Sequence, residues 1–168
     1  MNWNATEFFS HSTECNKFAQ DHHFKFCKVS GLNGFEEALG RMLSTQAFVC
    51  ISDIGNGYTD IENTPHNRTV KTVFLAVRHK LDSMDARLES METLRELFRQ
   101  FMSVLIREKT LLAQDGIYLD GRIQFNEIDQ YFFSGSACAY FQIYFNKYIN
   151  LTFNTSEWTG DIADAYGD

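Results

Sequence analysis

The chain has 168 residues, a length that suits one domain with a single core. Its residues are 44% hydrophobic and 22% charged, with 16 Phe and 7 Tyr, which excludes a globally disordered protein. The formal net charge is -7 and the basic residues are scattered, so we expect no nucleic-acid partner. No apolar run approaches the roughly 20 residues that cross a bilayer, so we expect no membrane partner.

The first residues lack the basic and apolar segments of a secretory signal, which predicts synthesis in the cytoplasm. Two of the four cysteines, Cys50 and Cys138, lie in apolar runs typical of strands. A reduced thiol in such a run behaves as a small buried hydrophobe. We therefore expect no disulfide to be required.

One group of side chains could bind a metal: Cys15, His22, His23 and Cys27 fall within thirteen residues, and thiolates and imidazoles are zinc ligands. Structural zinc sites usually take their ligands in two separated pairs, and this spacing offers no such pairs. The sequence favours solvent-facing histidines beside partly buried cysteines. We expect no metal, cofactor or catalytic residue, although the spacing alone leaves metal binding by these four residues open.

The first half of the chain predicts two helices and three strands. Residues 1–32 indicate a short helix followed by a strand, and residues 33–46 have apolar positions at helical spacing behind Asn33, a plausible N-cap. The apolar run 47–51 predicts a buried strand. The polar residues 52–68, with turn-forming glycines and the only proline, predict a long exposed connection, and residues 69–79 alternate as in a strand.

The second half has the stronger patterns. Residues 82–110 form one broad apolar helical face, with acidic residues at the start and basic residues at the end, as the helix dipole favours. Residues 117–119 and 122–128 predict strands separated by an Asp-Gly turn. In 137–145 an apolar face that includes Phe141 alternates with a semi-polar face that includes Gln142, as in a strand with a helix over one face.

These elements predict an α+β fold: a mixed or antiparallel sheet of about four strands, a long helix packed on one face and a second, shorter helix. Residues 1–153 are expected to form one domain, in which 1–32 is the less certain, N-terminal extension. Residues 154–168 carry four acidic side chains and no basic one, and are expected to be a mobile tail.

Tyrosine and arginine, which are enriched at the centres of interfaces, mark two candidate contact surfaces. Tyr140 and Tyr144 share one face of a predicted strand, where packing inside the domain is an equally good explanation. Tyr58, Ile61 and Arg68 lie in the exposed connection 52–68 and could anchor a partner. These five residues are the predicted interface.

The order helix, strand, long loop, strand, long helix, strand pair resembles that of the tail-terminator and tail-completion proteins of long-tailed bacteriophages. The resemblance covers about residues 33–153 and is carried by four segments, namely 48–51, 73–77, the helix from Asp85, and 139–145. It implies a prophage-encoded, non-enzymatic protein that forms a ring with itself and with neighbouring virion proteins at the head–tail junction. A virion location follows from that resemblance alone.

Two other functions fit the same residues. One is a small ligand-binding or enzymatic α+β domain with a pocket beneath the long helix, for which a deep cleft converging on His66, His79 or acidic side chains would be the sign. The other is an adaptor that binds one host protein through the same loop or tyrosine face. The oligomer number, the strand order and the identity of the partner are not fixed by the sequence.

Overall fold

The computed structural model describes residues 3–62, 64–80, 82–128 and 135–166, and shows an α+β fold. The helical segments, in chain order, are α1 (Ala5–Cys15), α2 (Lys17–Asp21), α3 (Gly31–Arg41), α4 (Met84–Gln114), the 3-10 turn η1 (Thr155–Glu157) and α5 (Asp161–Tyr166). The strands are β1 (Phe24–Val29), β2 (Ala47–Ser52), β3 (Asn56–Asp60), β4 (His66–Arg78), β5 (Ile117–Leu119), β6 (Phe125–Ile128) and β7 (Ser136–Tyr148).

Within the described residues the sheet is mixed and has seven strands, so the expected number of about four is too low. The strands β4 and β7, of 13 residues each, pair antiparallel along their whole length at the centre of the sheet. Each of them receives two short strands along its other edge: β2 and β3 lie end to end beside β4, and β5 and β6 beside β7. The edge strand β1 pairs with β2 in the parallel direction.

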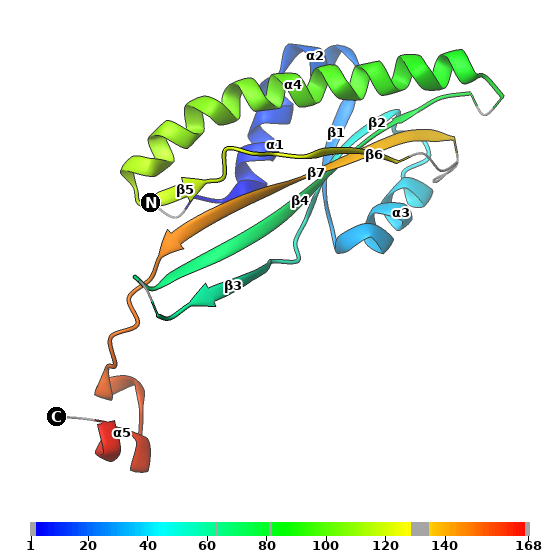
Figure 1. Ribbon diagram of the computed structural model, residues 1–168. Helices are drawn as coiled ribbons and strands as arrows, with labels where there is room; N and C mark the ends of the chain where they lie inside the picture. The colour runs from blue at the N-terminus through cyan, green and yellow to red at the C-terminus, as the bar shows by residue number, and fades with distance from the viewer. Residues whose placement is uncertain (1–2, 63, 81, 129–134, 167–168) are drawn as a thin grey trace.

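Helices cover the two faces of the sheet unequally (Figure 1). The long helix α4 and the N-terminal α1 cover one face, where Phe9, Leu97 and Phe141 are fully buried. On the other face α3 covers only the end of the sheet near β2, where Phe35 and Leu39 pack in a second, smaller cluster. The sequence predicted a long helix packed on one face and a second, shorter helix. Both are present, as α4 and α3.

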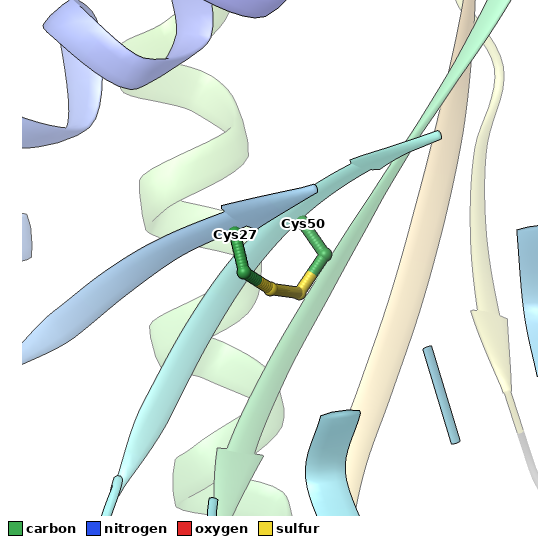
Figure 2. The surroundings of a disulfide bond; sticks show 2 residues. All are labelled: Cys27 and Cys50. Atoms are coloured by element: carbon green, nitrogen blue, oxygen red, sulfur yellow. A yellow bond between two sulfur atoms is a disulfide. The ribbon is translucent and has the colours of Figure 1, made fainter. Parts of the chain in front are cut away.

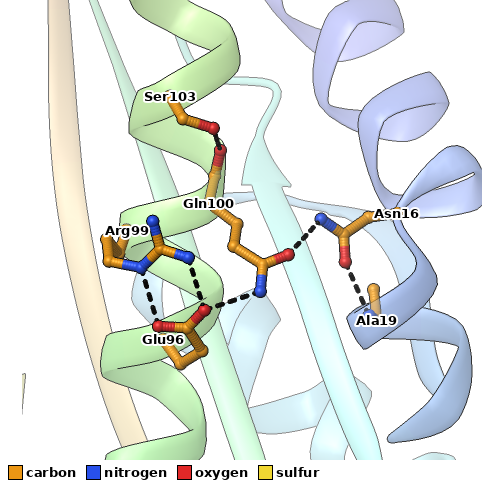
Figure 3. Close-up of polar contacts among 6 residues, drawn as sticks. All are labelled: Asn16, Ala19, Glu96, Arg99, Gln100 and Ser103. Carbon is orange, nitrogen blue, oxygen red and sulfur yellow. Dashed lines mark hydrogen bonds and ion pairs between the residues drawn. The ribbon is translucent and has the colours of Figure 1, made fainter.

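The first 32 residues are attached to the domain by a polar network as well as by packing. The Asn16 side chain accepts a hydrogen bond from Ala19 N at 2.7 Å, which caps α2, and donates to Gln100 Oε1 of α4 at 2.8 Å (Figure 3). Gln100 in turn donates to Glu96, which also accepts from Arg99. Hydrogen bonds from Arg99 and then Gln100 lower the pKa of Glu96 to about 2, so this carboxylate is ionised at neutral pH.

The helix α3 begins at Gly31, which has a left-handed φ of 72°, so the prediction of Asn33 as the N-cap is wrong. Its C-terminal end is held by Arg78, the last residue of β4. The Arg78 side chain donates to Leu39 O at 2.5 Å, Met42 O at 3.3 Å and Thr45 O at 2.8 Å, and lies over the Phe48 ring.

We expect Arg78→Met to lower the free energy of unfolding by about 2 kcal/mol, because carbonyls at the end of α3 lose a charged donor. Urea unfolding followed by circular dichroism measures this. Arg41→Met is the matched control, since Arg41 lies in α3 itself but is exposed and forms an exposed ion pair with Glu37. Equal midpoints for the two variants would contradict this account of how α3 is held.

The prediction that residues 52–68 form a long exposed connection is wrong in part, because this segment contains β3 and the beginning of β4. A Cβ on Gly57 would lie 1.8 Å from the carbonyl oxygen of Arg68, so this glycine permits a close approach of β3 to β4. In the sequence alone, the same glycine indicated a break in regular structure. The turn that joins the two strands includes Ile61, which is exposed.

Candidate assembly face

The half of the sheet that α3 leaves uncovered carries a set of aromatic and polar side chains, which we call the open face. Strand pairing decides its membership, because directly opposed residues point to the same side of a sheet. Tyr58 lies opposite Arg68, which lies opposite Asn146, which lies opposite Tyr118. The rest of the open face is formed by the neighbouring rows, namely Asn56, Asp60, His66, Val70, Thr72, Gln142, Tyr144 and Tyr148.

The centre of the open face is a charged and aromatic cluster around Arg68. Its guanidinium donates to Asp120 Oδ2 at 3.1 Å and lies 5.1 Å from the centre of the Tyr144 ring. The backbone N–H of Arg122, and then Arg68, lower the pKa of Asp120. The position of Arg68 is therefore fixed from two sides, and its side chain is still 26% exposed. A fixed, partly exposed arginine beside tyrosines is typical of an interface centre.

A hollow of about 150 Å³ lies beside this cluster, lined by His66, Tyr118, Asn146 and Tyr148. The rings of Tyr118 and Tyr148 meet edge to face at 5.7 Å. Asn146 Oδ1 is shielded from solvent and has no hydrogen-bond partner among the described residues. A buried acceptor without a donor is unfavourable, because it has lost its hydrogen bonds to water.

The structure brings three of the five predicted interface residues together: Tyr58, Arg68 and Tyr144 lie on the open face. Ile61 lies at its margin, in the turn after β3, and is 71% exposed. Tyr140 lies further along β7, where it packs against Phe74 in the cluster under α3.

Sequence reasoning missed Tyr118, which is 46% exposed on the open face. Its strand, β5, has only three residues, too few for an alternating pattern to reveal which side chain faces outward.

The four side chains for which the sequence left metal binding open, Cys15, His22, His23 and Cys27, do not form a metal site among the described residues. Cys27 and Cys50 are directly opposed in β1 and β2 and form a disulfide, with Cα atoms 4.7 Å apart (Figure 2). The expectation that Cys50 is a reduced thiol is therefore wrong, because the parallel pairing of β1 with β2 places the two sulfurs side by side. Across the part of the chain that the structure describes, no three His, Cys, Asp or Glu side chains are placed to hold a metal ion.

The other two cysteines remain thiols. Cys15 is exposed, and Cys138 is buried as predicted. Burial raises the pKa of Cys138 to about 12, so its reactive thiolate form is scarce at neutral pH. Cys15 is consequently the accessible thiol of the described chain.

The pocket expected beneath the long helix has a counterpart. A cavity of about 370 Å³ lies between the C-terminal half of α4 and the segment from β5 towards β6, which we call the α4 groove. Its walls are mostly apolar, formed by Phe98, Met102, Leu105, Ile106, Leu119 and Ile123, with Lys109, Asp120 and Gly121 completing the lining. His66 and His79 do not converge on it: they lie at opposite ends of β4, roughly 40 Å apart at strand rise.

Comparison of the chain with protein-family models and with curated proteins finds no match in either set. Among the described helices, none is long and apolar enough to span a membrane.

Proposed function

We propose that this chain is a non-enzymatic assembly protein that joins copies of itself into a ring, as the phage tail terminators that it resembles do at the head–tail junction. The observation that carries the proposal is the open face. Tyr58, Tyr118 and Tyr148 are each about half exposed there, at 57%, 46% and 53%, around a fixed arginine. Aromatic and arginine side chains of this kind contribute most of the binding energy at protein interfaces.

The hollow lined by His66, Tyr118, Asn146 and Tyr148 gives the open face a second reason to bind a protein. A partner side chain that fills this hollow would bury the exposed rings of Tyr118 and Tyr148. Neighbouring virion proteins are the other partners that the resemblance implies. In this proposal the protein is synthesised in the cytoplasm and ends in the virion.

The solution mass across a concentration series, measured by light scattering coupled to size exclusion, tests this function. We expect the wild type to form a species several times the chain mass of 19.4 kDa. We expect the double variant Tyr58→Ala/Arg68→Ala to shift the concentration of half-assembly upward by about tenfold or more, because it removes two central anchors.

The matched control is Leu43→Ala/Arg41→Ala, which removes an exposed apolar side chain and an exposed arginine that lie outside the open face. This control is expected to assemble like the wild type. A wild type that stays monomeric at every concentration would overturn self-assembly. A wild type that binds a single host protein one to one through the open face would replace the ring with the adaptor function.

A further inference from the structure

The last described residues form an arm with unusual side chains for an exposed segment. Residues 149–166 continue from β7 beyond the sheet, and four of their large apolar side chains are exposed, namely Leu151, Phe153, Trp158 and Ile162. Leu151 is 50% exposed, Trp158 47% and Ile162 44%. The rings of Phe153 and Trp158 stack, with centroids 6.1 Å apart and planes 17° from parallel. The arm thus holds an ordered aromatic pair that the body of the domain does not cover.

The direction of the arm is set by the sheet. Ile149 N donates to Pro65 O at 3.0 Å, which prolongs the β4–β7 pairing by one residue before the arm departs. Figure 1 shows the arm continuing from the end of β7 and running away from α4.

The α4 groove has the complementary surface. Six of its lining residues are apolar, and Ile106 at its lip is 69% exposed. Its volume of about 370 Å³ is within the range that accommodates a large aromatic group. Each chain exposes both an apolar groove and an apolar arm. When two copies meet, the arm of one copy can fill the groove of the other, so that both apolar surfaces are buried.

Charge favours the same pairing. Residues 149–168 carry acidic side chains that include Glu157 and Asp161, and no Lys or Arg. The lining of the α4 groove contains Lys109 and Asp120, and the Asp120 carboxylate is already paired with Arg68. The exposed Arg122 follows two residues later in the chain, so Lys109 and Arg122 place basic charge beside the groove. On a chain with a net charge of -7, a basic rim beside an apolar groove attracts an acidic, apolar segment.

We propose that the arm of one copy, residues 149–166, occupies the α4 groove of the next copy and inserts Trp158 between α4 and the β5–β6 segment. The contact joins two different surfaces, and such a heterologous contact closes a ring when it is repeated around an axis. This inference rests on the proposed self-assembly and adds to it the segment and the acceptor site.

Site-specific cross-linking between two differently tagged full-length chains tests the contact. One chain carries Thr159→Cys, at the exposed neighbour of Trp158, and the other Ile106→Cys, both in a Cys15→Ala background, and a short bismaleimide joins the thiols. The buried Cys138 does not compete, because burial raises its pKa to about 12. We expect a mixed dimer in several-fold higher yield than with Val104→Cys, a control on the same helix that is exposed but does not line the groove.

Equal yields from Ile106→Cys and Val104→Cys would overturn the proposal. So would a chain carrying both Thr159→Cys and Ile106→Cys that cross-links only within itself, because the arm would then occupy its own groove.

Solution mass separates failure of this inference from failure of the proposed function. We expect Trp158→Ala and Ile106→Glu each to raise the concentration of half-assembly by about tenfold, since each removes a buried apolar contact. Rings that persist in both variants but are lost in Tyr58→Ala/Arg68→Ala would overturn the arm contact and leave the assembly function standing. A monomeric wild type would overturn both.

Discussion

Phe141→Ala is expected to lower the free energy of unfolding by about 3–5 kcal/mol. Phe141 is fully buried in the middle of β7, and its ring lies 5.7 Å from that of Phe9 in α1 and 5.1 Å from that of Phe98 in α4. The strands, the N-terminal helix and the long helix therefore meet at this side chain. Its truncation leaves a cavity that three separate elements would have to close together.

Because domains of this size are stable by roughly 5–15 kcal/mol, this loss would leave a protein that is close to unfolding. Urea unfolding followed by near- and far-ultraviolet circular dichroism gives the difference. Phe153→Ala is the matched control, since the same truncation in the exposed arm should change stability by less than about 0.5 kcal/mol. A loss below about 1 kcal/mol for Phe141→Ala would contradict the packing described for the centre of the sheet.

Removal of the Cys27–Cys50 disulfide is expected to lower the free energy of unfolding by about 3 kcal/mol. The two cysteines are 23 residues apart, and the loop that they close contains α3. The bond restricts the unfolded chain, and it also ties the edge strand β1 to β2. Unfolding of the oxidised wild type is compared with that of Cys27→Ala/Cys50→Ala and of the wild type in dithiothreitol.

Cys15→Ala is the control for this comparison, because it removes an exposed thiol that forms no disulfide. Without dithiothreitol, Cys15→Ala should unfold at the same urea midpoint as the wild type. With dithiothreitol, both proteins should lose the same free energy of unfolding. Identical midpoints for the oxidised and reduced wild type would show that the bond does not form in solution.

The sequence predicted the elements whose patterns are strong. The helix α4 and the strand β7 were found because a periodic apolar face repeats over many residues in each of them. The end of β4 from His66 to Arg68 was missed because its three residues are all polar, so no apolar alternation marks it. β3 was missed because Gly57 was interpreted as turn chemistry, whereas the close approach to Arg68 requires it.

The candidate site depends on pairings that no local pattern encodes. Tyr58, Arg68 and Tyr118 become neighbours because β3 and β5 pair with opposite sides of the β4–β7 ribbon. The disulfide likewise follows from the register of β1 on β2, which joins cysteines that the sequence offered as separate thiols. Composition pointed to tyrosine and arginine as candidates, and the tertiary pairing decides which of them share a surface.

The position of β7 at the centre of the sheet has a consequence for synthesis. β4 ends at Arg78, and the strand that pairs with its whole length begins at Ser136. At ribosomal rates of about 5–20 residues per second, roughly 3 to 12 seconds separate the two. During that interval β7 has not yet been synthesised. The edge of β4 that contains Val73 and Leu75 therefore has no strand to pair with. We expect this chain to rely on chaperones while it is on the ribosome, and to aggregate when translation stops before β7.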